Sequence, residues 1–255
     1  MRLTTTTIAA MAFLAAPVSA TLYFSEDGNS EGLYVLDTDT GAATNVGTSG
    51  VTGSTVGLAP GADNDSLFGT IWADTADINA DGSGSTVVGD ASAEGMAYDP
   101  VTNTLWGAIN GSFFTIDTGN FDTKSSLASP GQDVEGLAYD GAGGVFGLAD
   151  GGDLLRYDIF ADIWSPIGNT GVNFDQAGLA YDMATGNLYA KGDQDSFLYL
   201  IDALTASITE IGDTGISNGG GLAFVSDAVA VPAPAAIALF GLGLAGLGLR
   251  RRKTA

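Results

Sequence analysis

One phrase, Gly followed by Leu or Met and then Ala, recurs through this chain and limits the folds open to it. Its copies begin at Gly57, Gly95, Gly136, Gly178 and Gly221. Successive copies lie 38, 41, 42 and 43 residues apart. A regular period of about 20–50 residues indicates a repeat architecture in which each repeat is one supersecondary unit.

Three further phrases follow the first in a constant order. The second joins an aliphatic and an aromatic residue, at Leu67-Phe68, Leu105-Trp106, Val145-Phe146 and Leu188-Tyr189. The third ends in Asp or Asn, at Asp37, Asn79, Asp117, Asp158 and Asp202. The fourth ends ten residues later, at Gly47, Gly89, Leu127, Gly168 and Gly212. Each phrase is rich in β-branched or aromatic residues and is bounded by turn residues, which is typical of short strands.

Four strands in about 41 residues match one blade of a β-propeller. We name the strand positions A to D and expect A, with its small residues, nearest the crowded axis. The chain enters at position B, because Thr21-Leu22-Tyr23-Phe24 matches the second phrase, and a lone A strand lies at residues 221–224. Strands B, C and D from the N-terminal end and strand A from the C-terminal end then complete a fifth blade. The sequence therefore predicts an all-β, five-bladed propeller over residues 21–227. A solenoid or a sandwich is the alternative, but neither explains the strands missing at both ends.

The charge of the chain excludes one class of partner. Between the termini only Lys124, Arg156 and Lys191 are basic, against all 30 acidic residues. Such a surface repels phosphate backbones, so we expect no nucleic-acid partner. The chain has no histidine and no cysteine, which excludes Ser-His-Asp and Cys-His catalysis and ordinary zinc sites. Of the metals, those that prefer oxygen ligands, such as calcium, remain.

The N-terminal 20 residues have the features of a secretory signal peptide. Arg2 precedes an apolar stretch from Ile8 to Ala16, and Val18-Ser19-Ala20 is a small-residue cleavage site. We expect cleavage after Ala20 and export across the inner membrane.

The C-terminal segment, residues 228–255, is a linker followed by an apolar tail. Ala228 to Leu249 carries no charge over 22 residues, which is long enough to cross a bilayer. We place a transmembrane helix at about residues 234–249, with the basic cluster of residues 250–253 on the cytoplasmic side.

The order of these features resembles the PEP-CTERM sorting signals of Gram-negative bacteria, in the variant with a Val-Pro-x-Pro-Ala opening. The resemblance covers about residues 231–253, and Ala233 stands where the name-giving motif has glutamate. It implies recognition by an exosortase-type membrane protease, removal of the tail, and release at the cell surface or into an exopolysaccharide matrix. The residues that it assigns to the sorting signal are Val231, Pro232, Pro234, Arg250, Arg251 and Arg252.

One segment resembles the start of a calcium-binding loop. Asp77, Asn79 and Asp81 alternate and are followed by Gly82, but Val88 stands where such a loop needs a bidentate glutamate. The segment also coincides with the turn between strands C and D, and an ordinary hairpin turn is the favoured interpretation. The loops from D to A and from B to C place many further aspartates on one propeller face, as an acidic rim around the channel. This rim either binds calcium or glycan hydroxyls or is merely solvated, and solvation is the favoured interpretation. Its aspartates are Asp27, Asp74, Asp90, Asp133, Asp150, Asp153, Asp175, Asp193, Asp195 and Asp213.

The aromatic residues divide into two groups. Those inside the phrases have a constant place in the repeat, which favours packing between blades over binding of sugars. They include Tyr98, Trp106, Tyr139, Phe146, Tyr181 and Tyr189. Trp72 and Trp164 lie outside the phrases and are the candidates for an exposed stacking residue.

Three functions remain open, and the first is favoured. It is a non-enzymatic structural or binding module, exported and presented at the cell surface or in the matrix. The second is a calcium-dependent carbohydrate-binding propeller. The third is a secreted glycan hydrolase, which needs only two carboxylates but also a deep cleft to hold them.

Overall fold

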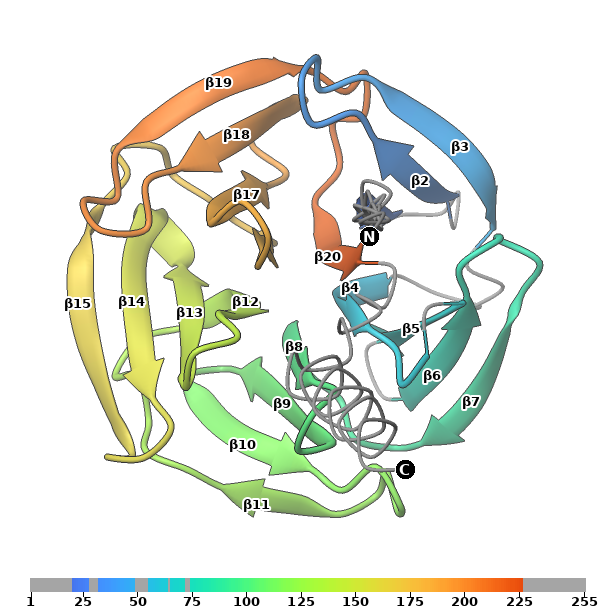
Figure 1. Ribbon diagram of the computed structural model, residues 1–255, viewed down its shortest axis with the longest axis vertical. Helices are drawn as coiled ribbons and strands as arrows, with labels where there is room; N and C mark the ends of the chain where they lie inside the picture. The colour runs from blue at the N-terminus through green and yellow to red at the C-terminus, as the bar shows by residue number, and fades with distance from the viewer. Residues whose placement is uncertain (1–19, 28–31, 49–54, 64, 72–73, 227–255) are drawn as a thin grey trace, which may run out of the picture. The chain divides into compact units, whose positions relative to one another are not determined.

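The computed structural model describes residues 20–27, 32–48, 55–63, 65–71 and 74–226. Across these residues the chain forms five four-stranded antiparallel sheets arranged around a common axis (Figure 1). The predicted signal-peptide segment up to Ser19, the sorting residues and the predicted transmembrane helix lie outside the described residues. No helix within the described ranges is long and apolar enough to cross a membrane.

Four blades are each made from consecutive strands. The first contains β4 (Thr55–Pro60), β5 (Ser66–Ile71), β6 (Asp74–Asn79) and β7 (Ser85–Gly89). The second contains β8 (Gly95–Asp99), β9 (Thr104–Ile109), β10 (Ser112–Ile116) and β11 (Lys124–Ser126). The third contains β12 (Val134–Tyr139), β13 (Gly144–Ala149), β14 (Asp153–Asp158) and β15 (Ile163–Asn169), with a 3-10 turn at Asp150–Gly152. The fourth contains β16 (Gly178–Asp182), β17 (Asn187–Lys191), β18 (Phe197–Ile201) and β19 (Ile208–Asp213).

The fifth blade joins the two ends of the propeller. Its strands are β20 (Gly220–Ser226), β1 (Ala20–Glu26), β2 (Gly32–Leu36) and β3 (Ala43–Thr48), in that order across the sheet. Seven residue pairs align β1 with β20, from Ala20 opposite Ser226 to Glu26 opposite Gly220. The predicted closure by strands B, C and D from one end and A from the other is confirmed. Closure leaves no open edge between the first blade and the last.

The repeat phrases align across the strands as predicted. The residue after Gly-Leu/Met-Ala pairs with the aliphatic residue of the second phrase in every blade, as in Tyr98 opposite Leu105 and Phe224 opposite Leu22. The inner strands β4, β8, β12, β16 and β20 contact one another around the axis. Glycine at the head of the phrase is required there, because a Cβ on Gly95 would lie 2.6 Å from the Glu135 carbonyl oxygen of the next blade.

The aspartate of the Tyr-Asp phrase fixes the turn between strands A and B. The Oδ1 atoms of Asp99, Asp140 and Asp182 accept bonds of 2.7–2.9 Å from the backbone N–H two residues later. Such Asx turns are a common reason for aspartate in tight loops. These three aspartates of the repeat phrase therefore stabilise turns.

The aromatic residues of the phrases pack between blades, as predicted. Each ring after Gly-Leu/Met-Ala contacts the second-phrase ring of the preceding blade, with centroids 5.2–5.7 Å apart. The pairs are Phe68–Tyr98, Trp106–Tyr139, Phe146–Tyr181 and Tyr189–Phe224. This distance is the range in which aromatic pairs contribute about 0.5–1.5 kcal/mol beyond area burial.

Candidate functional site: an acidic cup above a closed channel

The central channel is closed by one apolar side chain from each blade. These residues, which we call the apolar plug, are Leu58, Met96, Leu137, Leu179 and Leu222. Each occupies the second position of the Gly-Leu/Met-Ala phrase, and each is at most 2% exposed. The throat that they line has no space for a water molecule.

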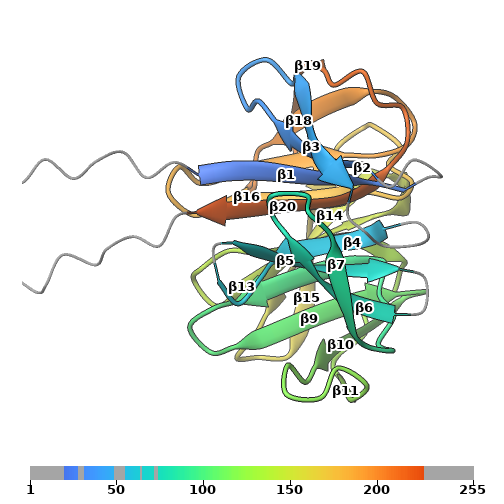
Figure 2. The same ribbon diagram turned by 90° about the vertical axis from the view of Figure 1, so that its right-hand side faces the viewer.

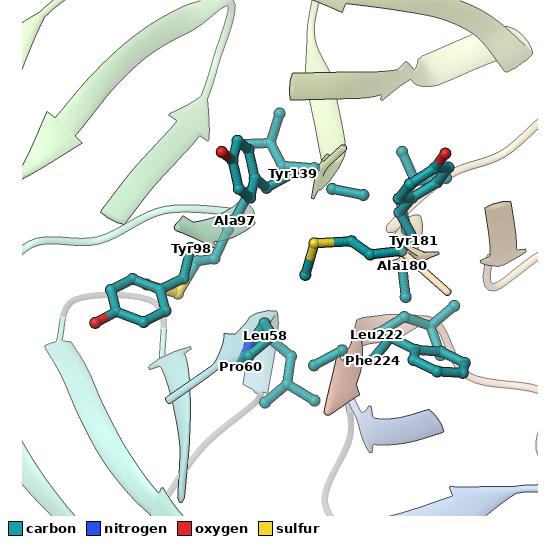
Figure 3. A pocket seen from close by; sticks show the side chains of 15 residues that line it. Leu58, Pro60, Ala97, Tyr98, Tyr139, Ala180, Tyr181, Leu222 and Phe224 are labelled. Atoms are coloured by element: carbon teal, nitrogen blue, oxygen red, sulfur yellow. The ribbon is translucent and has the colours of Figure 1, made fainter. Parts of the chain in front are cut away.

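Two faces of the propeller lie at the ends of this channel. The loops from D to A and from B to C form one face, which we call the DA/BC face. The turns from A to B and from C to D form the other, the AB/CD face. On the AB/CD face the channel opens into a small apolar mouth with a volume of about 30 Å³, lined by Pro60, Tyr139, Tyr181 and Phe224 among others (Figure 3). Small-molecule pockets usually have volumes of about 300–1,000 Å³, so this mouth is not one.

On the DA/BC face a group of carboxylates surrounds the channel. We call Glu94, Glu135, Asp150 and Asp175 the acidic cup. One carboxylate oxygen from each of Glu135, Asp150 and Asp175 lies within 4.8 Å of the others. Glu94 and Glu135 also line a cavity of about 70 Å³ with Asp175 and Gln176, which has room for a few water molecules or one ion.

The backbone places these side chains at the axis. Glu135 is the extra residue at a register shift between β12 and β13, where Val134 and Gly136 flank it, and such a bulge redirects a side chain. Backbone bonds hold the neighbouring loops in place, with Asp150 N–H donating to the Asp133 carbonyl at 3.1 Å and Asp193 N–H to the Asp175 carbonyl at 3.0 Å.

Burial and mutual repulsion change the protonation of the cup. Burial, and next the charge of Asp150, raise the pKa of Glu135 to about 8. Burial also raises the pKa of Glu94 and, together with the charge of Asp175, that of Asp150. Burial and the neighbouring carboxylates therefore favour the protonated form of Glu135, beside the Asp150 side chain. Carboxylate oxygens at this spacing are the ligand type that a hard cation such as calcium prefers.

The predicted calcium residues lie elsewhere, on β6 and in the β6–β7 turn. Asp81 Oδ1 accepts from Ser83 N–H at 2.9 Å, and Asn79 Nδ2 donates to Ser83 Oγ at 3.0 Å. Gly82 N–H donates to the Asn79 carbonyl at 2.9 Å, which closes the turn. Asp77 Oδ1 is buried without a hydrogen-bond partner, and burial raises the pKa of this carboxyl. These bonds form the hairpin turn; calcium binding here stays a prediction.

Of the predicted acidic rim, the structure brings only part to the axis. Asp150 and Asp175 enter the cup, whereas others bond within their own loops. Asp213 Oδ1 accepts from Gly215 N–H at 2.8 Å, and Asp195 accepts from both Phe197 N–H and the Tyr199 hydroxyl. Glu94 and Glu135 were not among the predicted residues, although both directly precede the glycine of the repeat phrase.

The remaining predicted residues have mixed outcomes. The prediction that Trp164 is an exposed stacking residue is wrong. Its ring packs against Phe113 and Tyr157, and its Nε1 donates to the Ala128 carbonyl at 2.9 Å. Trp72 lies outside the described residues. Ala20 is the first residue of β1, so cleavage after it would leave that strand nearly whole.

Comparisons with known proteins bear on the tail and on the fold. Residues 230–253 match the PEP-CTERM protein-sorting motif, a motif that exosortase recognises and that implies export and C-terminal membrane anchoring before processing. No curated protein matches the chain in sequence. The propeller is similar to a chain in the crystal structure of a nidogen/laminin complex, with a TM-score of 0.56, 13% identity, and coverage of 81% of this chain and 98% of that one. A protein of unknown function from Bacteroides thetaiotaomicron has a TM-score of 0.49 and 11% identity, over 76% of this chain and 50% of that one.

Proposed function

We propose that this protein is a non-enzymatic propeller that exosortase processes and that acts at the cell surface or in an exopolysaccharide matrix as a structural or binding module. The sorting motif at residues 230–253 is the observation that carries this proposal. The closed ring supports it, because both ends of the propeller pair within one blade and leave no unpaired terminal strand, which suits a module that must resist aggregation outside the cell.

The geometry favours a module over a glycan hydrolase. Glycosidases hold two carboxylates on either side of a bound sugar, in a cleft that can enclose it. Here the carboxylates surround a cavity of about 70 Å³, and the apolar plug fills the channel beneath them. Among the described residues, the space between these carboxylates is smaller than the roughly 300–1,000 Å³ of a usual small-molecule pocket.

Intact-mass spectrometry of the protein from its own host tests the proposal. We expect residues 1–20 to be absent and the chain to end near residues 231–234. The double variant Pro232→Ala/Pro234→Ala should run to Ala255 and stay in the membrane fraction, whereas Thr254→Ala, just beyond the matched motif, should be processed like the native chain. A native mass that runs to Ala255 in the membrane would contradict processing and leave a plain anchored protein.

A calcium-dependent carbohydrate-binding propeller is the second candidate, and the three carboxylates within 4.8 Å favour it. A cation that binds only the folded state stabilises it by RT ln(1 + c/Kd), where c is the free cation concentration, so the melting temperature rises with the logarithm of c above Kd. We expect calcium to raise the melting temperature of the native protein and not of Glu135→Gln/Asp175→Asn. Asp77→Asn is the matched control that separates the cup from the β6–β7 turn. An unchanged melting temperature at millimolar calcium would exclude this candidate.

A further inference from the structure

Both ends of the propeller leave it on the AB/CD face. Strand β1 begins at Ala20 and β20 ends at Ser226, and these two residues are partners in the closing sheet. Figure 2 shows the start of β1 and the end of β20 at the same edge of the propeller. The chain after Ser226 therefore starts from this face.

The same face carries large apolar side chains in positions where turns normally have polar ones. Val101 in the β8–β9 turn is 89% exposed, Phe160 in the β14–β15 turn 89%, and Leu204 in the β18–β19 turn 88%. Met183 in the β16–β17 turn is 48% exposed. All four lie on A-to-B or C-to-D turns. Single exposed apolar residues are common, but several on one face mark an interaction surface.

Two of these side chains, Met183 and Phe160, extend the apolar mouth of the channel outward. Met183 lines the mouth beside Tyr139 and Tyr181. It also lies over the neighbouring blade, since a Cβ on Gly141 would be 2.6 Å from Met183 Sδ. Gly143 lies in the same β12–β13 turn as Gly141, and a Cβ added to it would lie 2.6 Å from the Phe160 ring. Phe160 therefore covers this turn as well. The apolar surface therefore runs from the axis across the third and fourth blades.

The length of the following segment limits how far this face can lie from a membrane. Seven residues, 227–233, separate Ser226 from the expected start of the transmembrane helix at about residue 234. A fully extended chain spans at most about 3.3–3.6 Å per residue, so the bilayer surface lies within about 30 Å of the end of β20.

We propose that the AB/CD face docks on the surface of a lipid bilayer while the tail is anchored, with Val101, Phe160, Met183 and Leu204 entering the interface. This inference rests on the proposed sorting function, because it requires the anchored tail. The chain has a net charge of −22, which repels anionic lipids, so the surface fits a zwitterionic bilayer. Tail processing would then release a propeller that the face alone holds only weakly.

The absence of cysteine makes this proposal directly testable. Leu204→Cys and Val101→Cys place a unique thiol on the AB/CD face, and Ser217→Cys, in the exposed β19–β20 loop, places one on the DA/BC face as the matched control. Each full-length variant is labelled with a bimane fluorophore and reconstituted through its tail into phosphatidylcholine vesicles that contain spin-labelled phosphatidylcholine. Because interfacial side chains enter about 5–10 Å into the lipid, we expect at least about twofold stronger quenching at positions 204 and 101 than at 217.

The outcomes separate this inference from the function on which it rests. A protein that fails to float with the vesicles has no anchor, which overturns both. A protein that floats with all three labels equally unquenched and open to aqueous iodide overturns docking alone. Labels shielded from iodide but not quenched by lipid would mean that a second copy of the chain covers the face, which also overturns it. A further variant, Phe160→Ser, should reduce quenching at position 204, whereas Val87→Ser on the outer strand β7 should not.

Discussion

Replacing Lys191 by methionine isolates the one fully buried positive charge among the described residues. Lys191 ends β17 and is 0% exposed. Its Nζ donates to the carbonyls of Gly192 at 3.1 Å and Asn218 at 2.8 Å, and it lies 4.9 Å from the centre of the Phe24 ring. It therefore connects the fourth blade to the closing one, where the two ends of the chain meet.

Burial makes the contribution of Lys191 depend on pH. Burial lowers the pKa of Lys191 from 10.5 to about 8. The negative charges of nearby carboxylates oppose this shift; they belong to Asp195, Glu26, Asp193 and Asp213. The unfolded chain keeps this lysine charged up to about pH 10.5. Stability from this group is therefore complete above that pH and is lost as the pH falls through about 8. At about 1.4 kcal/mol per pKa unit, the charged form costs the folded protein about 3 kcal/mol at pH 7, of which about 2 kcal/mol is recovered by pH 9.5.

The assay is urea unfolding of the native protein and of Lys191→Met at pH 7 and pH 9.5. Methionine has a similar length and no charge, and the loss of two hydrogen bonds should lower its stability equally at both pH values. Other titrating groups cancel in the difference between the two proteins. We expect the native protein to gain about 2 kcal/mol over the variant between the two pH values. A difference that stays constant to within about 0.5 kcal/mol would refute the reasoning, because it would mean that Lys191 keeps an ordinary pKa.

Three further predictions concern the cup, the plug and the repeat. The pKa of Glu135 is raised to about 8, so the stability contributed by its protonated form is lost as the pH rises through that value. Glu135→Gln should therefore flatten the fall in melting temperature between pH 6 and pH 9, and an unchanged fall would contradict this. Leu137→Ala should lower the free energy of unfolding by about 2–5 kcal/mol, and the matched Met96→Leu by less than about 1.5 kcal/mol, as measured by urea unfolding; equal effects would show that the plug is loosely packed. Gly221→Ala should cost about 1–3 kcal/mol by the same measurement, because its Cβ would collide with Leu58 in the next blade; a neutral result would mean that the inner strands can separate.

The fold could be predicted because its signals are local and repeated. Strands alternate with period two, their turns demand Gly, Asp or Asn, and four such units recur in one order. The lone A strand at one end and the B, C and D strands at the other then fit only a closed ring. The same logic assigned Tyr98 and Trp106 to packing between blades, and the structure confirms it.

The site was harder to predict because its members come from different blades. Glu135 in β12, Asp150 after β13 and Asp175 in the β15–β16 loop are neighbours only because these segments converge at one end of the axis. Glu94 and Glu135 share a place directly before the repeat glycine, but nothing local distinguishes Asp150 and Asp175 from the many aspartates that hold turns. Glu135 is also directed by a bulge in β12, which a strand pattern of period two does not reveal.

The sequence by itself determined the repeat, the ring closure and the sorting tail, since each depends on residues near one another in the chain or on a constant period. Only the tertiary structure decided which carboxylates meet at the axis, which lysine is fully buried, and that the exposed apolar turns lie on the face where β20 ends. Those properties depend on distances between blades and on the exclusion of solvent. Residues far apart in the chain acquire them only when the five sheets close around one axis.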